Sequence, residues 1–204
     1  SVGRITLNRP RALNALTLDM CVDIREALDA WNADGRLRCL ILCGAGGKAF
    51  CAGGDVKSVA AGAGAARSGP PGRPGTLAAD FFREEYHTDH ALALLKLRGT
   101  AQQVSIWDGV VMGGGAGVSM HGAFRVATET TLFAMPEAGI GLFPDVGGSH
   151  VLPRLRGGVG VGTYIGLTGH RLRAADLIHC GLATHYVPRD RLPGLLEQLE
   201  SGGG

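Results

Sequence analysis

Two carboxylates lie eight residues apart in a segment that is otherwise apolar and rich in glycine and proline. Glu137 and Asp145 each follow a proline within the run Phe-Ala-Met-Pro-Glu-Ala-Gly-Ile-Gly-Leu-Phe-Pro-Asp-Val-Gly-Gly, at residues 133–148. A carboxylate held among buried side chains loses hydration, so its pKa rises toward neutral pH. A general acid or base needs such a pKa. The alternative is structural, with Glu137 capping a helix and Asp145 closing a turn.

The surroundings of these acids predict an irregular but buried segment. Proline and glycine interrupt any regular helix here. The large apolar side chains predict burial and not a surface loop. They are Phe133, Met135, Ile140, Leu142 and Phe143.

Two glycine-rich runs are candidates for backbone contact with a ligand. One is Gly-Gly-Gly-Ala-Gly at 113–117, where three glycines entering a predicted helix are costly for helix stability. The other, at 44–55, precedes a helix predicted to begin near Asp55, and a flexible turn is the alternative there. Glycine lets backbone N–H groups approach a ligand oxygen. The second run lacks the phosphate-loop pattern.

Composition excludes several classes of protein. The chain has 204 residues and a net charge of +2, which offers no basic field for nucleic acid. Its apolar content is 45%, and no apolar run is long enough to span a membrane. The five cysteines form no C-x-x-C pair, so we expect them to be buried and reduced, in a reducing compartment. No metal site and no secretory signal are predicted.

The first half of the chain predicts alternating strands and helices. A strand over 2–7 is followed by an amphipathic helix over 16–31, with Thr17 as its N-cap. The apolar run at 39–43 predicts a strand buried on both faces. This order is typical of a βα crossover. Low-complexity residues 60–76 predict a mobile surface loop.

A helix then opens at Phe81 and runs to about residue 96, and its Glu85 is expected on the buried side. Strands are predicted over 103–108, 126–127, 131–133 and 181–187, and helices within 152–169, 174–179 and 192–199. We expect a single domain over 1–200, followed by a linker-like tail at 201–204.

Several motifs, in order, resemble one known family. They are Ile5-Thr6-Leu7-Asn8-Arg9-Pro10, Phe50-Cys51-Ala52-Gly53-Gly54-Asp55, Phe81-Phe82-Arg83-Glu84-Glu85-Tyr86, Met112-Gly113-Gly114-Gly115, Met135-Pro136-Glu137 through Gly148, and Leu167-Thr168-Gly169. The chain resembles the crotonase (enoyl-CoA hydratase/isomerase) superfamily, and within it the 3-hydroxyisobutyryl-CoA hydrolase family. The resemblance runs from residue 2 to about 187.

The resemblance implies an α/β fold, a spiral of ββα turns with two roughly perpendicular sheets, and an acyl-CoA thioester as substrate. It implies an oxyanion hole formed by the backbone N–H groups of Gly54 and Gly114. It assigns catalysis to Glu137 and Asp145, and substrate binding to Glu85, Gly114, Glu137 and Asp145. No cofactor is implied, because CoA is part of the substrate. A homo-oligomer is one expected state.

Gly117 stands where hydratases of the superfamily carry a glutamate, which favours hydrolysis over hydration. The chain departs from the family at two places. Segment 95–105 does not resemble the usual Lys-Pro strand. The C-terminal helical part of the family is expected to be truncated.

We therefore expect hydrolysis of a short branched 3-hydroxyacyl-CoA. The alternatives are an enoyl-CoA hydratase or isomerase and a non-catalytic acyl-CoA-binding module. The expected location is the cytoplasm for a bacterial source and the mitochondrial matrix for a eukaryotic one.

Overall fold

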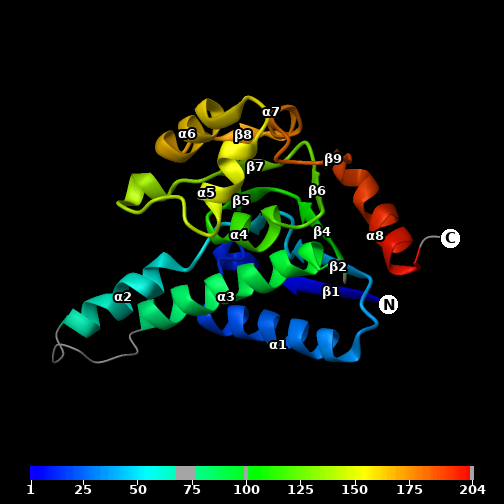
Figure 1. Cartoon of the computed structure of the whole chain (residues 1–204), viewed down its shortest axis with the longest axis horizontal. Coiled ribbons are helices and arrows are strands. Elements are labelled where there is room, and N and C mark those ends of the chain that lie inside the picture. Colours follow the sequence, from blue (N-terminus) through cyan, green and yellow to red (C-terminus); the bar gives the residue numbers. More distant parts are fainter. Residues whose placement is uncertain (68–76, 99–100, 203–204) are drawn as a thin grey trace.

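The computed structural model describes residues 1–67, 77–98 and 101–202. Within them the chain forms two β-sheets with helices around them (Figure 1). The larger sheet contains β1 (Val2–Leu7), β2 (Cys39–Gly44), β4 (Gln102–Trp107), β6 (Phe124–Ala127) and β9 (His185–Tyr186), in that order. The smaller sheet contains β3 (Ala49–Cys51), β5 (Val110–Met112), β7 (Leu132–Ala134) and β8 (Leu172–Arg173), in that order.

The helices follow the strand pairs. The α-helices are α1 (Leu18–Asp34), α2 (Val56–Arg67), α3 (Leu77–Leu97), α4 (Gly114–Met120), α5 (Gly148–Val151), α6 (Gly158–Thr168), α7 (Ala174–Cys180) and α8 (Leu192–Glu200). Among the described residues the short 3-10 helices are η1 (Pro10–Ala12), η2 (Glu137–Ile140), η3 (Leu152–Arg154) and η4 (Arg189–Arg191).

The chain winds as a spiral of ββα turns. The pairs β2/β3, β4/β5 and β6/β7 each give their first strand to the larger sheet and their second to the smaller one. Successive strands pair in parallel, except the antiparallel β7 and β8. Parallel neighbours require a crossover, and the helices between turns supply it. The expected crotonase-like α/β fold is confirmed.

Strand β2 is covered on both faces, as its continuous apolar run predicted. Leu40 and Leu42 pack in the main core, which includes residues of α1. Ile41 and Cys43 point the other way, into a second cluster that includes Leu192 of α8. The alternation follows the two-residue period of a strand.

Helix α1 begins at Leu18, two residues later than predicted. Thr17 is its N-cap, and the threonine hydroxyl accepts a hydrogen bond from the backbone N–H of Met20 at 3.2 Å. Gly35, with a φ of 67°, ends the helix in the left-handed conformation that favours glycine.

The prediction of a mobile loop at 60–76 is wrong for residues 60–67, which are helical. Helix α2 continues to Arg67 because five alanines, the strongest helix formers, outweigh two glycines in this stretch. Residues 68–76 lie outside the described part of the chain.

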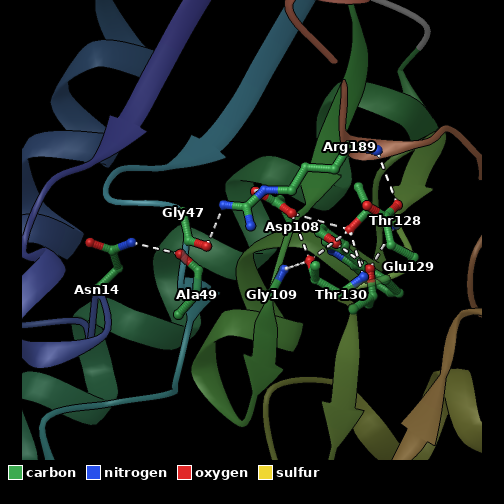
Figure 2. Close-up of polar contacts among 11 residues, drawn as sticks. Asn14, Gly47, Ala49, Asp108, Gly109, Thr128, Glu129, Thr130 and Arg189 are labelled. Carbon is green, nitrogen blue, oxygen red and sulfur yellow. Dashed lines mark hydrogen bonds and ion pairs between the residues drawn. The ribbon is translucent and has the colours of Figure 1, made fainter. Parts of the chain in front are cut away.

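A polar network fixes the segment that follows β9 (Figure 2). Asp108, on the turn between β4 and β5, accepts hydrogen bonds from the hydroxyls of Thr128 at 3.1 Å and Thr130 at 2.7 Å. Its other oxygen forms an ion pair with Arg189 at 3.1 Å. The Arg189 guanidinium also donates to the carbonyl of Gly47 at 2.5 Å, so one side chain joins three loops.

Candidate active site

The glycine-rich run at 44–55 is held by the segment before α1. The backbone N–H of Leu16 donates to the carbonyl of Gly53 at 2.8 Å, and the N–H of Asp55 donates to the carbonyl of Leu16 at 2.8 Å. Gly53 has a φ of 109°, which L side chains rarely adopt. Arg9 forms a 3.1 Å ion pair with Asp55, which adds a polar tie next to Gly54.

The glycine-rich run at 113–117 lies beside the run at 44–55. Gly114 opens α4 after Gly113, which has a φ of 49°. A methyl group built on Gly53 would lie 3.8 Å from the backbone nitrogen of Gly114. A methyl group on Gly54 would lie 3.7 Å from Glu85 Oε1, and one on Gly114 would overlap the same oxygen. The structure therefore brings Gly54 and Gly114 to one place.

Helix α3 turns one face toward these glycines. It packs between α1 and α4 (Figure 1). Phe81, Glu85 and Asp89 recur every four residues and are all buried. Phe81 covers Gly54, where an added methyl group would lie 2.9 Å from the ring. The expectation that Glu85 lies on the buried side is confirmed.

Glu137 is the first residue of η2, and its carboxylate lies next to the same glycines. A methyl group on Gly113 would lie 3.0 Å from Glu137 Oε1. The other oxygen, Oε2, has no hydrogen-bond partner among the described residues. Pro136 holds the cap position, so the alternative that Glu137 caps a helix is wrong.

The environment raises the pKa of both buried glutamates. Burial, and then the charge of Asp145, raise the pKa of Glu137 to about 7, against the effect of one backbone hydrogen bond. Burial, and then the charges of Asp145 and Glu137, raise the pKa of Glu85 to about 8. Both carboxyl groups can therefore gain or lose a proton near neutral pH, which suits acid–base chemistry.

Asp145 is half-buried and accepts a hydrogen bond from the hydroxyl of Tyr86 at 2.6 Å. Burial, and then this hydrogen bond, raise the pKa of Tyr86 above its usual value. A backbone carbonyl closes the local turn, since Gly148 N–H donates to Asp145 O at 2.6 Å. The Asp145 side chain is therefore not what closes it. The Asp145 side chain instead lines a cavity of about 830 Å³, and Asp89 lines the same cavity.

The predicted burial of the apolar side chains in the segment 133–148 is only half right. Phe133 and Met135 are fully buried, whereas Ile140 and Phe143 are 61% and 68% exposed, and Leu142 is exposed too. The buried pair lies in or next to β7. Ile140 ends η2 and the other two exposed residues follow it, where no regular element turns an apolar face inward.

Sequence reasoning missed Asp89 and Tyr86. The signal was available for Asp89, because it lies one helical turn after Glu85 on the same face. Tyr86 lies in a motif that resembles the family, but its contact with Asp145 joins two distant parts of the chain, which no local pattern shows.

Neither a metal site nor a membrane span is found in the described ranges. They contain no group of three or more histidine, cysteine, aspartate or glutamate side chains placed to hold a metal ion. No helix in the same residues is long and apolar enough to cross a bilayer. The five cysteines form no disulfide.

Comparison with known proteins identifies the family. A family model described as enoyl-CoA hydratase/isomerase matches residues 2–203, and the chain belongs to this family. Among solved structures, a carnitinyl-CoA dehydratase from Mycobacterium thermoresistibile is similar with a TM-score of 0.87 and 41% identity, covering 99% of this chain and 55% of that one. An enoyl-CoA hydratase from Rhodobacter sphaeroides 2.4.1 has a TM-score of 0.86 and 38% identity, covering 98% and 56%.

Curated relatives point to a particular branch of this family. The mitochondrial 3-hydroxyisobutyryl-CoA hydrolase of Xenopus laevis is 50% identical over 198 residues, which is 97% of this chain and 48% of the relative. The human protein of the same name is 47% identical over 199 residues, covering 97% and 47%. The chain thus spans about half the length of the curated relatives it matches.

Proposed function

We propose that the chain hydrolyses a short branched 3-hydroxyacyl-CoA, converting 3-hydroxyisobutyryl-CoA and water to 3-hydroxyisobutyrate and CoA, a step of valine degradation. The observation that carries the proposal is the buried Glu137 carboxylate, with a pKa raised to about 7, beside the paired glycine runs. The names of the 47–50% identical relatives support the choice of substrate.

In the proposed reaction the thioester carbonyl oxygen lies between the backbone N–H groups of Gly54 and Gly114. This oxygen gains negative charge when the carbonyl carbon is attacked. Fixed N–H dipoles stabilise that charge without reorganising, and one such donor is typically worth ~3 kcal/mol. Side chains are absent at both positions, which allows the carbonyl to come close to the backbone.

Glu137 acts in one of two ways. As a base it takes a proton from water, whose oxygen adds to the carbonyl carbon while the carbon–sulfur bond breaks and the CoA sulfur receives a proton. As a nucleophile its carboxylate oxygen attacks the carbonyl carbon and the carbon–sulfur bond breaks, so that CoA leaves as a thiolate and takes up a proton; water then hydrolyses the resulting mixed anhydride to the free acid and Glu137. Asp145 positions the water or the substrate's 3-hydroxyl, and Glu85 is a further polar contact. No cofactor takes part beyond the CoA of the substrate.

Two other functions are alternatives. The solved relatives named hydratase and dehydratase favour carbon–oxygen chemistry at a double bond, whereas Gly117 offers no acid of its own for it. A non-catalytic acyl-CoA-binding module would keep the glycine pair and lack turnover. For a eukaryotic source we propose the mitochondrial matrix, the compartment in the names of the animal relatives, and for a bacterial source the cytoplasm.

The test is a panel of acyl-CoA esters followed in two ways. Release of free CoA is measured with a thiol reagent, and loss of the double bond of crotonyl-CoA is measured by its absorbance. We expect CoA release from 3-hydroxyisobutyryl-CoA and no hydration at a comparable rate. Hydration as fast as CoA release would replace the proposal with the hydratase. Tight binding with neither reaction would replace it with the binding module.

A further inference from the structure

The second carboxyl group on the inner face of α3 is buried without a partner. Asp89 is 5% exposed, and neither of its carboxyl oxygens has a hydrogen-bond partner in the described part of the chain. An unpaired buried carboxyl group is costly for the folded state. Buried polar groups normally find partners, and one that does not is a candidate for contact with a ligand.

The space that Asp89 occupies exists because residue 117 is glycine. A methyl group built on Gly117 would lie 2.6 Å from Asp89 Oδ2 and 2.6 Å from Val146 Cβ. The carboxyl group of α3 therefore fills the place where a side chain of α4 would otherwise lie. The chain thus has a carboxyl group beside position 117, but Asp89 of α3 supplies it and not a residue of α4.

Asp89 lies one helical turn beyond Glu85, which is next to the proposed site of the thioester carbonyl. Glu85 touches Gly54 and Gly114, and Asp89 follows four residues later, about 6 Å farther along the helix. In a 3-hydroxyacyl group the hydroxyl lies on the second carbon beyond the thioester carbonyl. The distance from the carbonyl carbon to a group that hydrogen-bonds this hydroxyl at about 2.8 Å is similar. Asp89 also lines the cavity of about 830 Å³ that Asp145 lines. Asp145 already binds the Tyr86 hydroxyl, whereas both Asp89 oxygens are unpaired.

We propose that Asp89 is a specificity-determining residue that hydrogen-bonds the 3-hydroxyl of the acyl group, an assignment that rests on the proposed function. Burial, and then the charges of Glu85 and Asp145, raise the pKa of Asp89 well above its usual value, which favours the neutral, protonated carboxyl group. A neutral carboxyl group both donates and accepts a hydrogen bond, as a hydroxyl does. Asp145 is then left to position the water.

The test measures binding and not turnover. Two CoA analogues carry a methylene group between sulfur and carbonyl, so the scissile bond is absent. One bears the 3-hydroxyisobutyryl group and the other bears isobutyryl, which lacks the hydroxyl. We expect the protein to prefer the hydroxylated analogue about tenfold by calorimetry, the size of one good hydrogen bond in a buried site. Asp89→Leu should abolish the preference, and Asp89→Asn, which still donates and accepts, should keep most of it.

Two further variants make the comparison decisive. Asp80→Leu makes the same exchange near the start of α3 at a residue bonded to Arg83, and it should leave the preference unchanged. Gly117→Ala keeps Asp89 but displaces its carboxyl group, and it should lower the preference. A folded Asp89→Leu or Gly117→Ala protein that keeps the wild-type preference overturns the proposal. So does a wild-type protein that binds both analogues equally or neither.

The result is separable from the fate of the proposed function. If the wild-type protein releases no CoA but loses its preference in Asp89→Leu, the hydroxyl contact stands and hydrolysis fails. If it releases CoA with the preference unaltered by Asp89→Leu, hydrolysis stands and the hydroxyl contact fails.

Discussion

Glu137 is a carboxylate whose protonation changes near neutral pH, because burial and the charge of Asp145 raise its pKa to about 7. Glu137→Gln keeps the size and polarity of the side chain but removes its basic oxygen. We expect kcat to fall by at least ~100-fold, the low end for general-base catalysis. In the wild-type protein the rate should rise with pH through an apparent pKa near 7, as the reactive carboxylate forms. Steady-state CoA release from pH 5.5 to 9 measures both.

The matched control is Glu26→Gln, the same exchange at an exposed position of α1. It should keep the wild-type rate and pH profile. Near wild-type turnover in a folded Glu137→Gln protein would mean that another group activates the water.

Residue types and spacing single out Glu137, Asp145 and the two glycine runs as candidates, because acids among apolar residues and glycines in a costly place are visible in the sequence itself. Asp89 was not identified. Its environment depends on Gly117 of another helix and on Val146 of a loop, and no local pattern contains all three.

At the scale of elements, the strands were predictable where burial alone decides. β2 is the clearest case, since a continuous apolar run fits a strand covered on both faces. Prediction failed where two local effects compete. In α2 the helix propensity of the alanines outweighs the cost of the glycines. In 140–143 the irregular backbone at and after the end of η2 leaves apolar side chains exposed.

Arg189 connects elements that lie far apart in the chain. Its guanidinium binds Asp108 and the carbonyl of Gly47, and its backbone N–H donates to Glu129 at 3.0 Å. Arg189→Met keeps an extended side chain but removes these charged contacts. We expect the free energy of unfolding to fall by about 1 kcal/mol, because the side chain is partly exposed and the ion pair is screened. Urea unfolding measures the loss.

Arg191→Met serves as the control, since Arg191 is exposed and forms no ion pair within the described residues. It should change stability by only a few tenths of a kcal/mol. Equal losses in the two variants would show that the network around Asp108 adds nothing specific.

At the scale of the molecule, buried carboxyl groups make stability depend on pH. The pKa of Glu85 is about 8 in the folded state, against an ordinary value of 4.5 for a glutamate in water. Below pH 4.5 both states hold this proton, and the stabilisation is complete. As pH rises toward 8 the unfolded chain releases the proton first, so the folded state loses stability, and the loss levels off above pH 8.

Glu85→Gln removes this contribution, because an amide does not ionise. We expect the decline in unfolding free energy between pH 5 and pH 8 to become smaller by a few kcal/mol, at ~1.4 kcal/mol per pKa unit. Urea unfolding at the two pH values measures it. Glu84→Gln, at a partly exposed glutamate of α3 that is paired with Arg25 of α1, should keep the wild-type decline. An unchanged decline in Glu85→Gln would mean that Glu85 is ionised in the folded protein.

The strand order in both sheets follows the order of the chain, β1-β2-β4-β6-β9 and β3-β5-β7-β8. Each new strand is therefore added to an outer edge, and none is inserted between two that are already paired. Parallel pairing over long separations is otherwise slow, because the loop must close before the contacts form. During synthesis from the N-terminus, however, each turn emerges with its docking edge already in place. We expect this topology to let the nascent chain assemble turn by turn on the ribosome, with the Gly53–Gly54 loop in position before Glu137 is translated.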